Sequence, residues 1–337
     1  MSHPPGLPDD RLLDEVETQY VIRLAGLNWL DGGADSHAWV AMGTAPLGGS
    51  YVVKVRSGPF DSASLRLAHH LRKQGLGQVV APLTGWNNRQ WATVDDYTFS
   101  VYPFIQGIPA AERGLAPDQW TAFGRLVRQL HDQTLPPDLA SEIRAETWDT
   151  PWPAQVAALT AAVEAADQGD PVAASLAGVW RQHRAAVELL AGRAEALAAR
   201  LAATPAPLVL CHADLHTWNV LVDHDRHIWL IDWDTAMVAR KERDLMFAIE
   251  GISHDLVSPE ASQWFLDGYG PARPDPQALA YYRCAWAIQD CVSFGEEILA
   301  RPELGEAARL RALRLLSGVF KPGQIVRIAL ESSGGAP

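Results

Sequence analysis

The spacing of apolar and polar residues changes about one third of the way along the chain. Up to about residue 104, short apolar runs such as SYVVKVRSG alternate with Gly- and Pro-containing turns, which predicts antiparallel strands. Farther on, apolar residues recur at helical spacing. Residues 117–131, for example, place Trp120, Phe123 and Leu130 on one helix face. The chain is therefore predicted to have a small β-rich part followed by a larger, mainly helical part.

These patterns predict an α+β fold with two lobes, an N-terminal lobe over residues 1–104 and a C-terminal lobe over residues 105–337. In the first lobe the predicted elements are a helix over 11–25, three strands between 27 and 58, a helix over 62–74, and strands near 89–94 and 97–102. In the second they are the helix over 117–131, two Ala-rich helices within 154–203, a hairpin over 220–231, and mostly helix over 240–330. Clefts between lobes are common ligand sites.

Composition narrows the class of protein. The 337 residues carry a net charge of −12, which argues against nucleic-acid binding, because that requires a basic face to neutralise phosphates. No apolar run is long enough to span a membrane, and the N-terminal MSHPPGLPDDR lacks the pattern of a signal peptide. Three cysteines without metal-site spacing indicate buried thiols. We expect a cytoplasmic protein with neither a nucleic-acid nor a membrane partner.

The stretch over residues 210–234, LCHADLHTWNVLVDHDRHIWLIDWD, places acidic residues and histidines among apolar runs. Charged groups are costly to bury unless they are paired or bind a metal. The predicted hairpin brings the loop before one strand close to the loop after the other, so Asp214, Asn219 and Asp232 should converge. Two carboxylates and an amide oxygen suit a hard cation such as Mg²⁺.

The spacing also matches the template for phosphoryl transfer. In that template a loop Asp accepts the proton of an attacking hydroxyl, an Asn beyond four intervening residues holds metal, and a later Asp holds metal. Asp214, Asn219 and Asp232 occur in this order with that loop spacing. The alternative, carboxylates paired at the ends of an ordinary hairpin, accounts less well for the pattern.

These motifs resemble a known family. HADLHTWN is similar to the HGDxxxxN loop of the aminoglycoside phosphotransferase family, antibiotic kinases with a protein-kinase-like fold. IDWD resembles that family's equivalent of the kinase DFG segment. GADSHAW, YPFIQG, GRLVRQLH and KERDLMF look like the spectinomycin phosphotransferase branch of the family. The resemblance covers roughly residues 25–300.

The resemblance implies a role for each matching residue of the catalytic segments. Asp214 would be the catalytic base or hydroxyl-orienting group, and Asn219 and Asp232 would be Mg²⁺ ligands. His216 would support the loop or contact substrate or phosphate. Asp234 would orient the loop or meet substrate.

Two further residues of these motifs have expected supporting roles. His212 would brace the catalytic loop through a backbone carbonyl or the second Asp segment. Asp244, in KERDLMF, would brace backbone amides or an Arg of the C-terminal lobe.

Lys54 is the candidate for contact with the nucleotide phosphates. It lies on the third predicted strand, where Val53 and Val55 point to the opposite face, and the alternative is an ordinary surface lysine. Small residues in the preceding turn let backbone amides approach phosphate, and the lobe junction would bind adenine. The residues assigned to ATP, or to GTP as the other donor, are Lys54, Asp35, Ser36, His37, Tyr102, Phe104 and Ile105.

One departure from the kinase template concerns the partner of Lys54. The template pairs this lysine with a Glu on the next helix, but residues 62–74 contain no acid. Asp61 precedes that helix. It would either replace the Glu with a shifted geometry or cap the helix N-terminus, in which case the pairing is absent.

The acceptor pocket is expected in the C-terminal lobe. Trp286, Asp290, Ser293 and Glu297 follow i, i+4, i+7 and i+11 spacing, which places them on one helix face. An aromatic ring with two carboxylates suits a rigid cationic amine. The alternative is a solvated helix face anchored by one Trp.

The function expected from the residues and the resemblance is ATP-dependent O-phosphorylation of a small cationic antibiotic, foremost spectinomycin or a related aminocyclitol. One alternative is a kinase of another small hydroxylated acceptor, such as another aminoglycoside, a peptide antibiotic, or a choline- or homoserine-like metabolite. The other is an inactive nucleotide-binding module. The sequence leaves the oligomeric state open.

Overall fold

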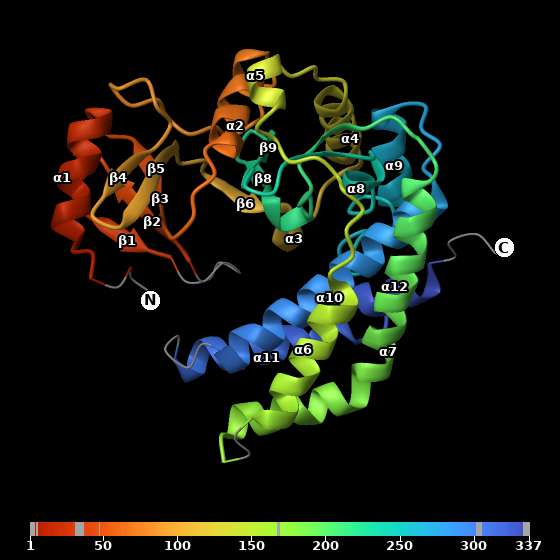
Figure 1. The fold of residues 1–337 in the computed structure, drawn as a ribbon. Coiled ribbons are helices and arrows are strands. Elements are labelled where there is room, and N and C mark those ends of the chain that lie inside the picture. Colours follow the sequence, from red (N-terminus) through yellow and green to blue (C-terminus); the bar gives the residue numbers. More distant parts are fainter. Residues whose placement is uncertain are drawn as a thin grey trace.

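A five-stranded antiparallel sheet and an N-terminal helix make the smaller lobe of the computed structural model, which describes residues 4, 6–30, 37–46, 48–166, 169–300 and 305–332 (Figure 1). Its elements are α1 (Asp9–Tyr20), β1 (Leu27–Trp29), β2 (Ala38–Thr44), β3 (Ser50–Ser57), β4 (Ala92–Val94) and β5 (Tyr97–Pro103). The strand order is β1-β2-β3-β5-β4. Helix α1 ends before residue 25, where the sequence pattern placed its end, because Val21 adopts the left-handed conformation.

The alternation of side chains along β3 positions the candidate nucleotide lysine. Val53 and Val55 are fully buried in a core that also contains Leu12 and Val16 of α1. Because successive strand residues point to opposite faces, Lys54 points away from this core. Lys54 therefore lies on the face of the sheet that is turned toward the larger lobe.

Helix α2 (Ala63–Lys73) packs with the larger lobe. Its Leu67 and Leu71 are fully buried in the same core as the C-terminal helices. Arg66 Nη2 lies 3.1 Å from Asp138 Oδ2 of the short helix α5 (Pro137–Ala140), and Figure 1 shows these two helices side by side. The division proposed after residue 104 falls between β5 and β6 in the chain, but α2 shares its core with the second lobe.

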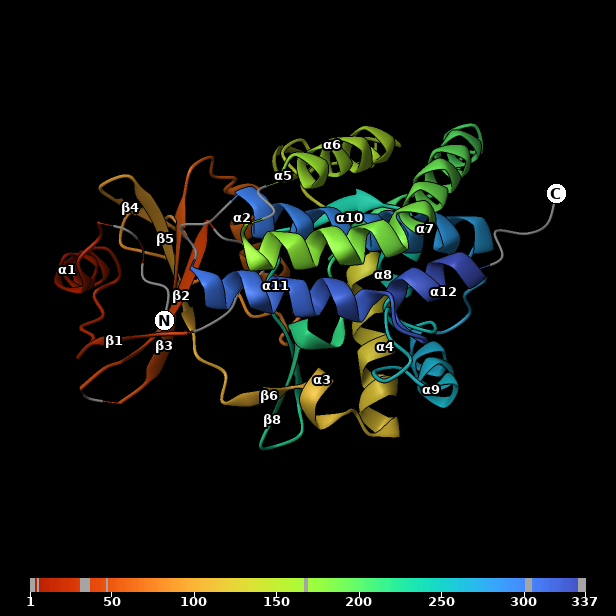
Figure 2. The ribbon, with the colours of Figure 1, turned by 90° about the horizontal axis from the view of Figure 1, so that it is seen from below.

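The larger lobe is mainly helical, as expected. Its elements are β6 (Gly107–Pro109), α3 (Ala110–Arg113), α4 (Pro117–His131), α5, α6 (Trp152–Ala165), α7 (Pro171–Ala202), β7 (Val209–Cys211), η1 (Thr217–Asn219), β8 (Val220–Asp223), β9 (Ile228–Leu230), β10 (Met237–Ala239), α8 (Glu242–Leu245), α9 (Pro259–Tyr269), α10 (Pro276–Ala300), α11 (Glu306–Val319) and α12 (Ile325–Glu331). Helices α7, α10 and α11 run side by side (Figure 2). Strands β6-β8-β9 and β7-β10 form two small sheets beside them. The two-lobed α+β prediction is confirmed.

Helices α4 and α9 approach closely at two glycines. A Cβ on Gly268 would lie 1.9 Å from the Thr121 carbonyl oxygen, and one on Gly124 would lie 2.0 Å from the Phe265 carbonyl oxygen. Both obstacles are backbone atoms, so neither contact can be relieved by rotating a side chain. The two helix backbones must separate to admit a methyl group.

We expect Gly268→Ala to lower the free energy of unfolding by about 2–3 kcal/mol, the usual cost of overpacking a close contact. Urea denaturation measures this quantity. Gly178→Ala in α7 is the matched control, because a Cβ there meets nothing within 4 Å and alanine favours the helix by up to about 1 kcal/mol. Equal stability of the two variants would contradict the close packing of α4 against α9.

Among the described residues, the helices include none with both the length and the apolar character needed to cross a bilayer.

Candidate active site

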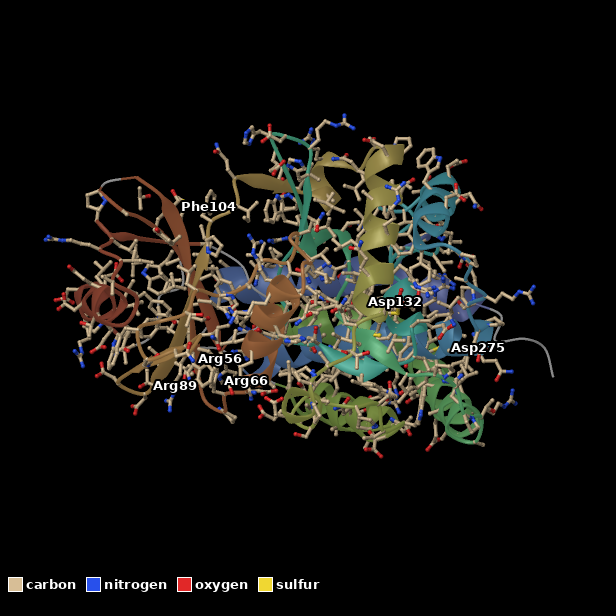
Figure 3. All side chains as sticks on the ribbon, turned by 90° about the horizontal axis from the view of Figure 1, so that it is seen from above. Arg56, Arg66, Arg89, Phe104, Asp132 and Asp275 are labelled. Atoms are coloured by element: carbon tan, nitrogen blue, oxygen red, sulfur yellow. The ribbon has the colours of Figure 1, made fainter. Side chains whose placement is uncertain are left out.

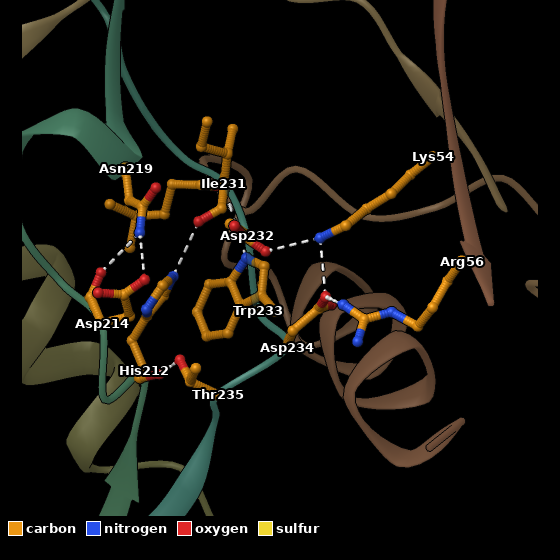
Figure 4. Close-up of polar contacts among 11 residues, drawn as sticks. Lys54, Arg56, His212, Asp214, Asn219, Ile231, Asp232, Trp233, Asp234 and Thr235 are labelled. Carbon is orange, nitrogen blue, oxygen red and sulfur yellow. Dashed lines mark hydrogen bonds and ion pairs between the residues drawn. The ribbon is translucent and has the colours of Figure 1, made fainter. Parts of the chain in front are cut away.

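The loop between β7 and β8 holds the Asp214 carboxylate in one orientation. Nδ2 of Asn219 donates to Oδ2 of Asp214 at 2.9 Å and to the Asp214 backbone oxygen at 2.8 Å (Figure 4). The η1 turn makes both contacts possible because it folds Asn219 back over the loop. Nε2 of His216 lies 3.1 Å from the other carboxylate oxygen, Oδ1. Asp214 is thus held from two sides, with 18% of its side chain exposed.

The buried carboxylate of Asp244 holds the backbone of this loop in place. Asp244 is fully buried and accepts hydrogen bonds from the backbone N–H of His212 at 2.9 Å and of Ala213 at 2.7 Å. Nε2 of His131 lies 3.1 Å from the same carboxylate. Burial acts to raise the pKa of Asp244, but the hydrogen bond and charge of His131 outweigh it and the pKa is lowered. These contacts hold Ala213 in a left-handed conformation (φ 67°) that non-glycine residues seldom adopt.

His212 connects the catalytic loop to the second acidic segment. Its Nε2 donates to the Ile231 carbonyl oxygen at 2.9 Å, and Thr235 Oγ1 donates to the His212 carbonyl oxygen at 3.0 Å. The backbone N–H of Ile231 in turn donates to the backbone carbonyl oxygen of Asn219 at 3.1 Å. The expected bracing by His212 through a backbone carbonyl is present, and it keeps the Asp214 and Asp232 segments in a fixed relation.

Lys54 reaches across from the smaller lobe to this second segment (Figure 4). Its Nζ lies 2.9 Å from Asp232 Oδ1 and 2.7 Å from Asp234 Oδ2. Arg56, two residues along β3, places Nη2 2.6 Å from the same oxygen of Asp234. Burial acts to lower the pKa of Lys54, but the charges of Asp232 and Asp234 outweigh it and raise the pKa, so the lysine stays protonated.

Asn219 and Asp232 offer the oxygen donors that a hard divalent cation requires. The NH₂ group of Asn219 is used by Asp214, which leaves its carbonyl oxygen Oδ1 as the group able to face a cation. The side chain of Asp232 is 44% exposed, and its backbone adopts a left-handed conformation (φ 62°). Its pKa is held low, because Lys54 outweighs the effect of burial. Since oxygen ligands suit Mg²⁺, this donor set fits that ion.

Tyr102 and Phe104, two of the other residues assigned to the nucleotide, lie near the junction of the lobes. Tyr102 lines one pocket of about 110 Å³ together with Lys54 and Asp234. Phe104 is 37% exposed in the connection between the lobes (Figure 3), and its N–H donates to the Ser50 carbonyl oxygen at 3.0 Å. That N–H is therefore committed to the sheet.

Four assigned residues remain. The Ile105 carbonyl oxygen accepts a 2.8 Å hydrogen bond from Gly107. Nδ1 of His37 lies 3.3 Å from Ser57 Oγ, so its ring is held at the end of β3. Asp35 and Ser36 lie outside the described residues.

Asp61 does not replace the missing helix acid. Its Oδ1 accepts a 2.9 Å hydrogen bond from the Ala63 N–H at the start of α2. Asp61 therefore stabilises the helix N-terminus, close to the capping alternative, but from the position before the N-cap residue Ser62. Sequence analysis missed both Asp234 as a partner of Lys54 and Arg56 as a second cation. The two-residue spacing on a strand was the available signal for Arg56, since it puts Arg56 on the same face as Lys54.

The acceptor candidates on α10 separate into two groups. The ring of Trp286 lies 6.2 Å from that of His216 and 4.9 Å from that of Phe247, and Trp286 is 8% exposed. Trp286 is therefore a wall beside the catalytic loop. Glu297 lies farther along α10, with a carboxylate oxygen 3.9 Å from Arg311 Nη2 on α11. The structure does not bring Glu297 to Asp214.

Asp290 belongs to the group around the catalytic loop. The pKa of Asp290 is raised to about 7. Burial is the largest cause, the charge of His216 acts to lower the pKa, and the charge of Asp214 acts to raise it. The pKa of His216 is also raised: burial opposes protonation, but Asp214 and Asp290 outweigh it. His216 is thus electrostatically linked to two carboxylates. Arg243, which sequence analysis missed, lies 5.5 Å from the Trp286 ring centre.

Comparison with known proteins identifies the family. Residues 30–282 match the profile of the phosphotransferase enzyme family, APH. The chain belongs to this family. The resemblance of HADLHTWN and IDWD is therefore confirmed, and the chain is a kinase-like phosphotransferase. No curated protein sequence matches it significantly.

Solved structures of phosphotransferases resemble this chain over nearly its whole length. A spectinomycin phosphotransferase, APH(9)-Ia, in complex with ADP and spectinomycin is 27% identical with a TM-score of 0.87, covering 98% of this chain and 100% of that one. Its AMP-bound complex is 26% identical with a TM-score of 0.83, covering 97% and 99%. A macrolide 2′-phosphotransferase, MphH from Brachybacterium faecium, is 24% identical with a TM-score of 0.54, covering 91% and 97%, and shares the fold.

The raised pKa of Asp290 predicts how the stability of the phosphotransferase depends on pH. Between about pH 4 and pH 7 the folded protein keeps a proton on Asp290 that the unfolded chain has lost, so stability falls as pH rises through this window. The raised pKa of His216 acts in the same direction. Asp290→Asn removes the first contribution. We expect this variant to gain about 2 kcal/mol relative to wild type between pH 5 and pH 8.

Urea denaturation at several pH values measures this gain. Glu296→Gln, on an exposed position of the same helix, is the control and should show the same pH dependence as the wild type. A constant difference between Asp290→Asn and the wild type across the range would show that Asp290 does not titrate in this window.

Proposed function

We propose that the protein transfers the γ-phosphoryl group of ATP to a hydroxyl group of an aminocyclitol antibiotic such as spectinomycin. The observation that carries this proposal is the likeness, over the full length of both chains, to an enzyme solved with ADP and spectinomycin. The arrangement of Asp214, Asn219, Asp232 and Lys54 supports phosphoryl transfer independently of the acceptor. GTP is the other candidate donor. The use of ATP agrees with the cytoplasmic location expected from the sequence.

Asp214 would act on the acceptor hydroxyl. Its carboxylate would accept the hydroxyl hydrogen and orient the oxygen toward the γ-phosphorus. It would take the proton as the new P–O bond forms and the bond from the γ-phosphorus to the bridging oxygen breaks, which releases ADP. Asn219 and His216 fix the carboxylate so that it need not reorient during the reaction. In this role Asp214 both positions the hydroxyl and accepts its proton, and the rest of the catalysis is positioning and charge stabilisation, because the transition state has little covalent chemistry for the protein to perform.

Lys54 would contribute charge on the nucleotide side, where its ammonium group faces the α- and β-phosphates. Asn219 Oδ1 and Asp232 would hold Mg²⁺, which when bound neutralises negative charge on the phosphates. The backbone link from Asn219 to Ile231 keeps these two ligands together.

The acceptor would lie between the catalytic loop and α10. Asp290 gives this region an ionisable carboxylate and Trp286 gives it an aromatic wall. A rigid acceptor with amino groups meets both, through charge pairing and ring contact. These features suit a compact cationic sugar better than a neutral one.

The decisive test measures ATP consumption with Mg²⁺ against aminocyclitols, aminoglycosides, peptide antibiotics and small amino alcohols, with mass spectrometry of the products. We expect spectinomycin to gain one phosphate with the highest kcat/KM of the panel. A higher kcat/KM on another acceptor would reject the aminocyclitol and keep the phosphotransferase chemistry. ATP binding with no product from any acceptor would favour the inactive nucleotide-binding module.

A further inference from the structure

The lysine that faces the nucleotide lacks the helix partner that the kinase template provides. Helix α2 contains no acidic residue, and Asp61, just before it, is used by the Ala63 N–H. The helix is also tied to the larger lobe through Arg66 and Asp138. Another group must therefore hold the ammonium of Lys54 in place.

Two carboxylates contact Lys54, but they differ in what else they can do. Asp232 pairs with Lys54 at 2.9 Å and is the candidate metal ligand. Asp234 pairs with Lys54 at 2.7 Å and with Arg56 at 2.6 Å (Figure 4). Once a divalent cation occupies Asp232, Asp234 is the carboxylate still able to hold Lys54. Its side chain is 27% exposed and that of Lys54 is 18% exposed, so solvent screens this pair only in part.

We propose that Asp234 is the positioning residue of Lys54 and that Arg56 holds Asp234 in place for this task. The inference rests on the proposed function, and it assigns to Asp234 an orienting role rather than contact with the acceptor. In this arrangement the acid that orients the lysine comes from the same short segment as the metal ligand.

This arrangement sets the position of the lysine relative to the metal ligand. Asp232 and Asp234 are two residues apart, so a shift of their segment moves both groups together. The segment is itself held to the catalytic loop by His212 and Thr235. Lys54, Asp232 and Asp214 are therefore connected through one chain of contacts that does not pass through α2.

Removing the Asp234 charge would leave the two cations Lys54 and Arg56 with one carboxylate in place of two. Lys54 and Arg56 balance Asp232 and Asp234 in the present structure. Without Asp234, Lys54 would pair with Asp232 alone and would compete with the cation for that carboxylate. Nucleotide binding and the phosphoryl-transfer step should both suffer, whereas binding of the acceptor should not.

The experiment compares Asp234→Asn, Asp234→Glu and Asp61→Asn in the full chain. Calorimetry gives the affinity for a non-hydrolysable ATP analogue with Mg²⁺, and steady-state kinetics separate KM for ATP, KM for the acceptor and kcat. We expect Asp234→Asn to lower the affinity for the analogue about 10-fold, which corresponds to the loss of one charge-assisted hydrogen bond. We expect kcat/KM for ATP to fall about 100-fold, because misplaced groups slow the chemical step, with an unchanged acceptor KM.

Three comparisons make the result specific. Asp234→Glu should recover part of the lost affinity because it restores the charge. Asp61→Asn should leave both the analogue affinity and the Tm nearly unchanged, because the asparagine side-chain oxygen can still accept the hydrogen bond from the Ala63 N–H. Arg56→Gln combined with Asp234→Asn should be no worse than Asp234→Asn alone, since Arg56 acts through Asp234.

Three outcomes would overturn the inference. They are unchanged analogue affinity in Asp234→Asn, a raised acceptor KM as its main defect, or a loss of affinity in Asp61→Asn equal to that in Asp234→Asn. Failure of the proposed function is distinguishable, because a wild-type protein that phosphorylates no acceptor still yields the comparison of analogue affinities.

Discussion

Asp214→Asn is expected to lower kcat by about 1,000-fold or more with little change in stability. The amide cannot take the proton of the acceptor hydroxyl, and removal of a positioned general base typically costs about 100- to 10,000-fold. The substitution is nearly isosteric, and its carbonyl oxygen can still accept the hydrogen bond from Asn219 that now reaches Oδ2 at 2.9 Å. Steady-state kinetics measure kcat, and thermal unfolding measures the fold.

A matched variant separates this effect from a general change in charge. Asp225→Asn removes a carboxylate from the turn between β8 and β9, which follows the Asp214 loop in the chain. The Asp225 side chain is 63% exposed. This variant should keep wild-type turnover. Affinity for a non-hydrolysable ATP analogue should persist in Asp214→Asn, because the proposed role of Asp214 is toward the acceptor hydroxyl and not toward the nucleotide. Turnover near the wild-type value in Asp214→Asn would remove this residue from the mechanism.

Asp244→Ala is expected to lower the free energy of unfolding by about 3–5 kcal/mol, the usual cost of removing one partner from a buried charged network. The substitution leaves the N–H groups of His212 and Ala213 and the ring of His131 without their acceptor. Because burial excludes water, these donors cannot regain hydrogen bonds from solvent. Urea denaturation measures the loss.

The pH dependence gives this prediction a second measurement. The pKa of Asp244 is lowered in the folded state. Its stabilising contribution is therefore present above the unfolded pKa, near pH 4, and is lost as the pH falls through the folded value. Asp244→Asn should be less destabilised than Asp244→Ala, because its amide oxygen can still accept one backbone hydrogen bond. A loss below about 1 kcal/mol in Asp244→Ala would show that the loop does not depend on this carboxylate.

Local patterns along the chain were enough to predict the architecture. Alternation on β3 buried Val53 and Val55 and turned Lys54 to the other face, and helical spacing predicted α4 over Pro117–His131. The hairpin that brings the Asp214 and Asp232 segments together was predictable for the same reason. Residues close in sequence are joined by short connections, so their relative placement depends on local turns and periodicity.

The candidate catalytic loop was likewise predictable, because its contacts are local. Asn219 contacts Asp214 five residues away, and His212 contacts the Ile231 carbonyl within the same hairpin unit. Asp244, 31 or 32 positions from the amides it holds, was anticipated from its motif. Its buried partner His131, 113 positions away in the chain, was not.

The partners of Lys54 were decided only by the tertiary structure. Asp232 and Asp234 lie 178 and 180 positions from Lys54, and no periodicity links residues so far apart. The packing of α2 in the core of the larger lobe and the coupling of Asp290 to His216 are of the same kind. The sequence by itself determined most of the helices, the strands of the smaller lobe, the candidate catalytic loop and the family, but not the short strands β6, β7 and β10 of the larger lobe. Which charges meet across the lobes depends on how those elements pack, because Coulomb interactions follow distance in space rather than separation along the chain.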